Sequence, residues 1–219
     1  MNFTSIENNL TLLELCLHIK SLTDDFYLVG GCVRNMLLNK TPNDFDIVCK
    51  LDLDTLISVL KDNNWKVSEA GKQFLVLIAS KNNQQFEISL YRKDGTYLDG
   101  RRPESVSIGN INTCAYRRDF TINALYFNPF TQELLDPTGK GIQDIKNKII
   151  RFIGRPSERI NEDFLRIFRA YRQAHTLDFT IERNTLKNMR KYFNEACQKL
   201  PPERIRAEIE KFNPNSISP

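Results

Sequence analysis

The chain has 219 residues, of which 41% are hydrophobic and 26% charged, a composition typical of soluble globular proteins with one large or two small domains. Five scattered cysteines without a CxxC pair argue against a disulfide framework or zinc site, and the lack of a long apolar run near the N-terminus argues against a membrane span, so we expect a soluble cytoplasmic protein. From Arg151 onward 14 Lys and Arg stand against 9 Asp and Glu, which favours a polyanionic partner or an ordinary solvated helical surface.

The first predicted elements lead into a glycine turn. Residues 4–22 have helical periodicity, and residues 27–29 are a short apolar strand that two glycines end. Gly30 and Gly31 lack a Cβ, so a ligand or a tight turn can approach the backbone closely. Residues 32–38 predict a helix with Arg34 in its first turn. Free backbone N–H groups and the positive end of a helix at one place favour a bound phosphate.

An acidic pair follows this turn at residues 44–48, which have the composition of a strand. Alternate side chains of a strand share a face, so Asp44 and Asp46 are predicted to point the same way. Two neighbouring carboxylates raise each other's pKa unless a cation lies between them. Magnesium prefers one or two carboxylates together with phosphate oxygens, so Asp44 and Asp46 are the predicted metal ligands.

Each of these pieces alone is weak, because Gly-Gly often marks a turn and Asp-x-Asp a solvated strand end. Together, in this order and spacing, they resemble motif A of the class II nucleotidyltransferases, the family of tRNA CCA-adding enzymes and bacterial poly(A) polymerases. The resemblance implies an α/β (α+β) fold: a DNA polymerase beta-like head with a small mixed sheet at residues 1–150, and a helical neck at residues 151–219.

Residues 74–80 and 85–91 resemble a hairpin around a polar turn. On its second strand Glu87 is the candidate for a third carboxylate beside the metal, since the superfamily usually has one on a neighbouring strand. An edge-strand glutamate in solvent is the alternative. Residues 92–110 resemble the flexible loop that family members keep between motifs A and B.

Residues 116–127 include an Arg-Arg-Asp sequence, which alone would favour a surface cluster of ion pairs. Downstream of motif A the segment resembles motif B. Arg117 and Arg118 can fork onto phosphate or sugar oxygens, Asp119 can pair with one of them or hold a ribose hydroxyl, and Asn123 can cap or hydrogen-bond. We therefore expect these four residues to bind the nucleotide.

Residues 157–175 predict one amphipathic helix with a slanted charged stripe of Asp163, Arg166, Arg169 and Arg172. An ordinary salt-bridged face is the usual explanation of such a stripe. Here the sequence resembles motif D, the amino-acid template of the family, in which Asp and Arg hydrogen-bond the incoming base. The resemblance assigns base choice to Asp163 and Arg166, and triphosphate or base contacts to Arg169 and Arg172.

Residues 201–212 resemble the start of motif E, so the resemblance covers residues 25–212 and corresponds to the head and neck of the family. Family members continue into helical body and tail domains that hold the acceptor stem of tRNA. Because phosphate contacts provide most of the affinity for RNA, either a homo-oligomer or a partner subunit supplies further RNA-binding surface, or tRNA binding is weak.

The resulting hypothesis is a Mg²⁺-dependent nucleotidyltransferase that adds C and A to the 3′ end of tRNA from CTP and ATP. Asp44 and Asp46, with Glu87, would hold the metal ions, and Gly31, Arg34 and Arg118 would hold the nucleotide. A poly(A) polymerase of the same family and a non-catalytic RNA-binding remnant are the alternatives. One departure concerns Asn35, which stands where the family motif GGxVRD has an aspartate, so weaker capping or ion pairing is expected there.

Overall fold

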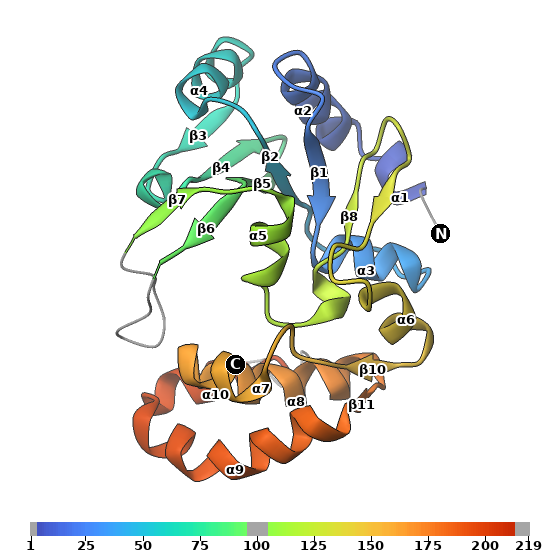
Figure 1. Cartoon of the computed structure of the whole chain (residues 1–219). Coiled ribbons are helices and arrows are strands. Elements are labelled where there is room, and N and C mark those ends of the chain that lie inside the picture. Colours follow the sequence, from blue (N-terminus) through green and yellow to red (C-terminus); the bar gives the residue numbers. More distant parts are fainter. Residues whose placement is uncertain (1–3, 96–104, 213–219) are drawn as a thin grey trace, which may run out of the picture.

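The computed structural model describes residues 4–95 and 105–212, which contain a seven-stranded mixed sheet (Figure 1). The strand order is β3-β4-β5-β2-β1-β8-β9, with β2 and β5 parallel and the other neighbours antiparallel. The strands are β1 (Phe26–Val29), β2 (Asp46–Cys49), β3 (Lys66–Ser68), β4 (Val76–Lys81), β5 (Gln84–Leu90), β8 (Tyr126–Phe127) and β9 (Leu134–Leu135). This arrangement confirms the predicted α/β fold with a mixed sheet.

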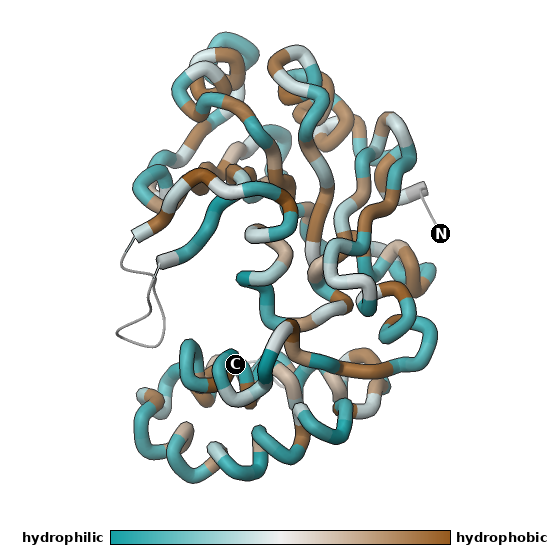
Figure 2. Tube along the Cα trace, viewed as in Figure 1, coloured by the Kyte–Doolittle hydropathy of each residue, from teal (hydrophilic) through white to brown (hydrophobic). Residues whose placement is uncertain are grey.

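Helices cover both faces of the sheet because successive strand residues alternate between two apolar clusters. The larger cluster joins Leu28, Ile47 and Ile88 to α2 (Leu10–Lys20), α3 (Gly31–Leu37) and α4 (Leu53–Asp62). The smaller cluster joins Val29, Val48 and Tyr91 to Cys114 and Ala115 of α5 (Ile111–Tyr116). Figure 2 shows hydrophobic residues concentrated along the strands between these helices.

The alternation also decides where the predicted acidic residues lie. Asp46 lies on the same face of β2 as Val48, and Glu87 on the same face of β5 as Ser89, so both carboxylates are on the face that α5 covers. The β5 residues on the other face, Phe86 and Ile88, are in the larger core.

The C-terminal part is mainly helical and lies at one end of the sheet (Figure 1). It is formed by α7 (Pro156–Glu162), α8 (Leu165–Leu177), α9 (Arg183–Lys199) and α10 (Pro202–Glu210). Between sheet and helices lie η2 (Thr121–Asn123), α6 (Gly141–Lys146), β10 (Ile149–Ile150) and β11 (Thr180–Ile181). The division at residue 150 stays a prediction, and β10 pairs in parallel with β11 across it. Within the described ranges no helix combines the length and apolarity that crossing a membrane requires.

The structure corrects four predicted elements. The helix at residues 4–22 is two helices, α1 (Thr4–Glu7) and α2, because the Asn9 side chain caps α2 at the Leu12 N–H. The strand predicted from residue 44 begins at Asp46, and the hairpin strand predicted from residue 74 begins at Val76, after the 3₁₀ turn η1 (Lys72–Phe74).

The fourth correction is the helix predicted at residues 157–175, which is interrupted between α7 and α8. Asp163 at this break is extended (φ −152°, ψ 106°), and its carboxylate accepts a hydrogen bond from the Leu165 N–H at 3.0 Å. The loop predicted at residues 92–110 contains β6 (Arg92–Asp94) and β7 (Val106–Ile108), which pair with each other, while its tip at residues 96–104 lies outside the described residues.

Candidate active site

The glycine turn lies directly against two predicted site residues. Gly30 has φ +87° and immediately precedes α3. A Cβ at Gly30 would lie 3.1 Å from Nη1 of Arg118 and 3.5 Å from Oδ2 of Asp46. Both the positive φ and the close approach require a glycine here. The fold therefore brings motif A and motif B together at this turn.

The acidic residues come together through the register of the parallel strands. Asp46 is the first residue of β2 and lies opposite Glu87 of β5, whereas Asp44 is exposed and precedes the strand. Burial raises the pKa of Asp46 to about 6, with a further increase from Glu87 and a smaller one from Asp44, partly offset by Arg118. The pair thus lacks a sufficient counter-charge of its own.

This arrangement fits a divalent cation. A metal beside Asp46 and Glu87 would remove their repulsion, and oxygen ligands of this kind are those that Mg²⁺ prefers. Among the residues that the structure describes, no three Asp, Glu, His or Cys side chains already converge on one point. Asp44, Asp46 and Glu87 are therefore adjacent candidates and not a closed set of ligands.

The backbone of motif B is hydrogen-bonded from the neck side by Arg159. The backbone carbonyls of Arg117 and Arg118 accept hydrogen bonds at 2.8 and 2.9 Å from Nη2 of Arg159 on α7. The guanidinium of Arg118 lies beside Gly30, Asp46 and the Tyr126 side chain of β8. Arg118 is thereby placed beside Asp46. From this position its guanidinium could contact a phosphate group.

A second group of predicted residues forms one buried network. Arg34, which is 9% exposed, donates from Nη1 to Oδ1 of Asn123 at 2.7 Å. Asn123 in turn donates to Asp119 at 3.3 Å, and Asp119 forms an ion pair with Arg169 of α8 at 2.6 Å. Four of the predicted site residues, from motifs A, B and D, are thus connected directly.

Each of the remaining predicted neck residues is paired with an oppositely charged residue of the neck. Arg166 is buried and bonds Oε2 of Glu162 at 2.7 Å, and Arg172 bonds Oε2 of Glu208 at 2.7 Å. Asp163 lies 3.6 Å from Nη2 of Arg204, and burial raises its pKa. Asp163 is not on the helix that carries the arginines, so the predicted continuous stripe is wrong, although Arg166, Arg169 and Arg172 do share α8.

The sequence patterns did not predict several contact partners of these residues. Gln173, Arg204 and Glu208 contact Arg34, Asp163 and Arg172 from positions far away in the sequence. Nothing local in the sequence indicates these contacts. Glu162 is different, because its spacing of four residues from Arg166 is that of a helical ion pair.

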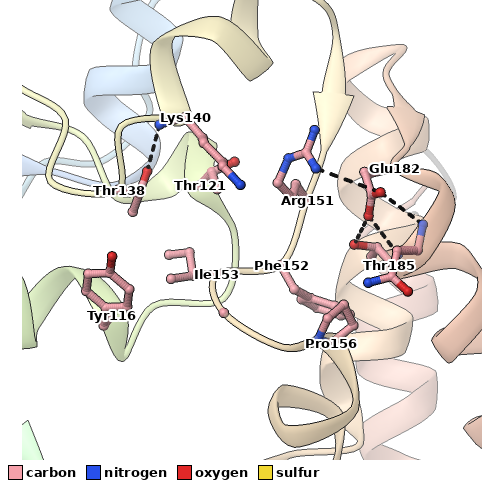
Figure 3. Close-up of a pocket in the computed structure, with 12 residues that line it drawn as sticks. Tyr116, Thr121, Thr138, Lys140, Arg151, Phe152, Ile153, Pro156, Glu182 and Thr185 are labelled. Carbon is pink, nitrogen blue, oxygen red and sulfur yellow. Dashed lines mark hydrogen bonds and ion pairs between the residues drawn. The ribbon is translucent and has the colours of Figure 1, made fainter.

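The cavity drawn in Figure 3, of about 340 Å³, lies between the sheet-bearing part and the neck. Its lining includes Tyr116 and Thr121, which precede and follow the Arg-Arg-Asp sequence along the chain. It also includes Arg151 and Glu182, whose Nη1 and Oε1 atoms are 3.8 Å apart. None of the predicted acidic residues lines it. A second cavity, of about 690 Å³, is lined by Arg117 together with Glu158 and Arg159.

Comparison with known proteins identifies the family. Residues 26–151 match the model of the poly A polymerase head domain, and residues 178–212 match a model described as the probable RNA and SrmB-binding site of polymerase A. The CCA-adding enzymes of Enterococcus faecalis and Oceanobacillus iheyensis are 37% and 38% identical to the chain over 187 residues. These alignments cover 85% of this chain but 44% and 45% of the relatives, so the chain spans about half their length.

Solved structures agree with this result. The Bacillus stearothermophilus CCA-adding enzyme in complex with CTP aligns with a TM-score of 0.79 and 25% identity, over 97% of this chain and 49% of that one. A tRNA nucleotidyltransferase complexed with a primer tRNA and an incoming ATP analogue aligns with a TM-score of 0.73 and 27% identity, over 90% of this chain and 57% of that one. The chain therefore belongs to the poly A polymerase head-domain family, the nucleotidyltransferase family that includes the CCA-adding enzymes.

Proposed function

We propose that the chain is a metal-dependent nucleotidyltransferase that adds C and A nucleotides to the 3′ end of tRNA from CTP and ATP, without a nucleic-acid template. The observation that carries this proposal is the meeting of Gly30, Asp46 and Arg118 at one turn, with Glu87 opposite Asp46. The similarity to CCA-adding enzymes over 85% of the chain supports the choice of substrate.

The metal is proposed to be Mg²⁺, with Asp46 and Asp44 as ligands and Glu87 beside them. Bound metal in such a site activates the attacking hydroxyl and stabilises the charge on the triphosphate. The chain's own contribution is to keep the carboxylates of Asp46 and Glu87 close together on one face of two neighbouring interior strands. The raised pKa of Asp46 reflects the electrostatic cost of holding them there, which a cation would relieve.

The nucleotide is proposed to lie between the glycine turn and α8. Arg118 and Arg34 would bind its phosphates, because both guanidinium groups lie beside the turn and fork-shaped cations suit phosphate oxygens. Arg117 and Arg172 would add positive charge, while Asp119 and Asn123 hold Arg169 and Arg34 in position. Gly31 would leave room for the backbone to approach the triphosphate.

Base choice is proposed for Asp163 and Arg166. A carboxylate accepts hydrogen bonds from an exocyclic amine, and a guanidinium donates to a ring nitrogen or carbonyl oxygen. Glu162 and the Arg159 carbonyl fix the Arg166 guanidinium at 2.7 and 2.6 Å, so it is held in place before any ligand arrives. Base recognition by preorganised protein groups is what an enzyme without a nucleic-acid template requires.

The neck offers a surface for RNA on α9, whose residues are mainly hydrophilic (Figure 2). Arg183, Lys187 and Arg190 are exposed at spacings of four and three residues, so they share one side of the helix. No ion pair involves them within the described ranges. We propose that this row of cations, inside the segment that matches the RNA-binding model, contacts tRNA phosphates. A second subunit that adds RNA-binding surface remains a prediction of the sequence.

The decisive experiment incubates the protein with Mg²⁺, each labelled nucleoside triphosphate, and tRNA that ends before its CCA. Incorporation of C and then A supports the proposal. Long A tails would instead support a poly(A) polymerase, the activity in the name of the matching head-domain model. No incorporation at any Mg²⁺ concentration, with RNA binding retained, would favour a non-catalytic RNA-binding protein.

A further inference from the structure

We propose that Gln173 of α8 is a positioning residue that fixes the Arg34 guanidinium beside the glycine turn and thereby sets the affinity for the nucleoside triphosphate. This inference rests on the proposed function, because it concerns the nucleotide site. The starting point is the hydrogen bond from Nη1 of Arg34 to Oε1 of Gln173, at 3.1 Å, between two residues 139 positions apart.

Arg34 is a buried cation whose direct partners are all uncharged. Its guanidinium donates to Oδ1 of Asn123 at 2.7 Å, to Oε1 of Gln173 at 3.1 Å, and to Oδ1 of Asn35 at 2.9 and 3.1 Å. No carboxylate of the described residues lies within ion-pair distance of Arg34. Asp119 is linked to Arg34 by hydrogen bonds only through Asn123, and its charge partly offsets the lowering of the Arg34 pKa that burial causes. Amide oxygens orient a guanidinium but do not neutralise it, so the charge is left for an incoming anion.

The departure at Asn35 accounts for the missing counter-charge of Arg34. In the family motif this position is an aspartate, which would pair with the neighbouring arginine directly. Here Asn35 keeps the hydrogen-bonding shape and removes the charge, and Arg34 is held from three directions by amides of α3, η2 and α8. Gln173 is the only one of the three that belongs to the neck.

The Gln173–Arg34 hydrogen bond is part of a closed chain of side chains that begins and ends on α8. Gln173 contacts Arg34, Arg34 contacts Asn123, Asn123 contacts Asp119, and Asp119 pairs with Arg169. Arg169 and Gln173 are four residues apart and therefore on the same side of α8. The helix that carries Arg166 and Arg172 is thus held at two points one turn apart, to Arg34 beside the glycine turn through Gln173 and to Asp119 of motif B through Arg169.

A role in packing alone does not account for a glutamine here. Gln173 is 9% exposed, and burying an amide is unfavourable unless it is hydrogen-bonded. Its oxygen faces a residue proposed to bind phosphate. Replacing the amide by an apolar side chain of the same shape would leave Arg34 with one fewer acceptor and its guanidinium less firmly oriented toward the triphosphate.

The test is Gln173→Met, which keeps the length of the side chain and removes the acceptor. We expect the KM for both CTP and ATP to rise roughly tenfold, since a hydrogen bond to a charged group is removed, with a much smaller change in kcat. The control is Thr180→Val, which removes another hydrogen bond between the neck and the preceding segment, the one of 3.3 Å to the Lys148 carbonyl, and should leave KM unchanged.

A double-mutant cycle separates positioning from a decrease in stability. Equilibrium dialysis with CTP is carried out on the wild type, Gln173→Met, Arg34→Met and the double variant. If Gln173 acts through Arg34, Gln173→Met weakens CTP binding in the wild type and has no further effect once Arg34 is absent. Equal effects in both backgrounds, or wild-type affinity in Gln173→Met, would overturn the inference. Failure of the proposed function is a different result: the wild-type protein binds CTP but incorporates no nucleotide into tRNA.

Discussion

Asp119, just after α5, and Arg169, on α8, form an ion pair in which Oδ2 and Nη2 are 2.6 Å apart. The Asp119 side chain is 8% exposed, and it also accepts hydrogen bonds from the Phe120 N–H and the Asn123 amide. This pair connects motif B to the neck helix independently of the backbone. It therefore ties the stability of the fold to the position of the proposed nucleotide-binding arginines.

The ion pair predicts a specific pH dependence of stability. Burial would raise the pKa of Asp119, but Arg169, Asn123 and Arg166 outweigh it and hold this pKa below its ordinary value. Ionised Asp119 therefore stabilises the fold above the ordinary carboxyl pKa, and this stabilisation is lost as the pH falls through the folded pKa. Asp119→Asn should lower the free energy of unfolding by about 3 kcal/mol at pH 7 and by much less at pH 3. Urea denaturation at both pH values measures this.

Asp178→Asn is a matched control, because this carboxylate is 97% exposed and lies 3.8 Å from Lys148. We expect no pH-dependent difference in its free energy of unfolding. An Asp119→Asn effect of the same size at pH 7 and pH 3 would contradict the assigned ion pair.

We expect ionised Asp46 to lower the stability of the metal-free fold and to be essential for activity. Because burial and Glu87 raise its pKa to about 6, ionised Asp46 destabilises the metal-free fold, increasingly as the pH rises from the ordinary carboxyl pKa to that value and by a constant amount above it. Asp46→Asn should therefore stabilise the metal-free protein by about 1–2 kcal/mol at pH 8. The same change should lower the rate of nucleotide transfer at least about a thousandfold.

Thermal unfolding with EDTA and with Mg²⁺ separates the two effects. The wild type should gain melting temperature with Mg²⁺, because a ligand that binds only the folded state stabilises it, and Asp46→Asn should not. An equal gain in both proteins would show that Mg²⁺ binds elsewhere.

Gly30→Ala tests the close approach at the glycine turn. An alanine at φ +87° is strained, and its Cβ would press on the Arg118 guanidinium at 3.1 Å. We expect a decrease of about 1–3 kcal/mol in the free energy of unfolding and a higher KM for CTP. Gly139→Ala is the control, since Gly139 has φ +65° with no atom within 4 Å of the added Cβ. It should share the decrease in stability while keeping the KM of the wild type.

Reversing charge on α9 tests the proposed RNA surface. Lys187→Glu/Arg190→Glu should raise the KM for tRNA and reduce the salt dependence of tRNA binding by roughly one unit of slope for each phosphate that the helix no longer neutralises. The KM for CTP should not change. Lys50→Glu/Lys66→Glu makes the same change of charge at two exposed lysines near the sheet. If both double variants weaken tRNA binding equally, only overall charge matters and α9 is not the surface that binds tRNA.

The motifs of the site could be predicted from sequence because they are local. The glycine turn, the strand before it and the helix after it depend on neighbouring residues, and the structure has all three. The expectation that Glu87 joins the acidic residues also agrees with the register, in which it lies opposite Asp46.

What could not be predicted depends on contacts between distant segments. The apolar periodicity of residues 157–175 continues through the break at Asp163, so it conceals an interruption that a single capping carboxylate produces. Similarly, no local pattern indicates that Glu208 and Arg204 of α10 face Arg172 and Asp163. Those pairs exist only because α10 packs on α8.

The parallel register of β2 and β5 determines which kinds of mutation in this part of the gene the protein can tolerate. Asp46 and Glu87 are 41 positions apart, and they meet only because successive residues of β5 alternate between the face that carries the carboxylates and the hydrophobic interior. A single inserted codon between Gln84 and Phe86 that left the start of β5 in register would turn Glu87 toward the interior and Phe86 outward. Insertions and deletions in this hairpin strand should therefore be tolerated far less than substitutions, whereas the Asn82–Asn83 turn beside it can vary in length.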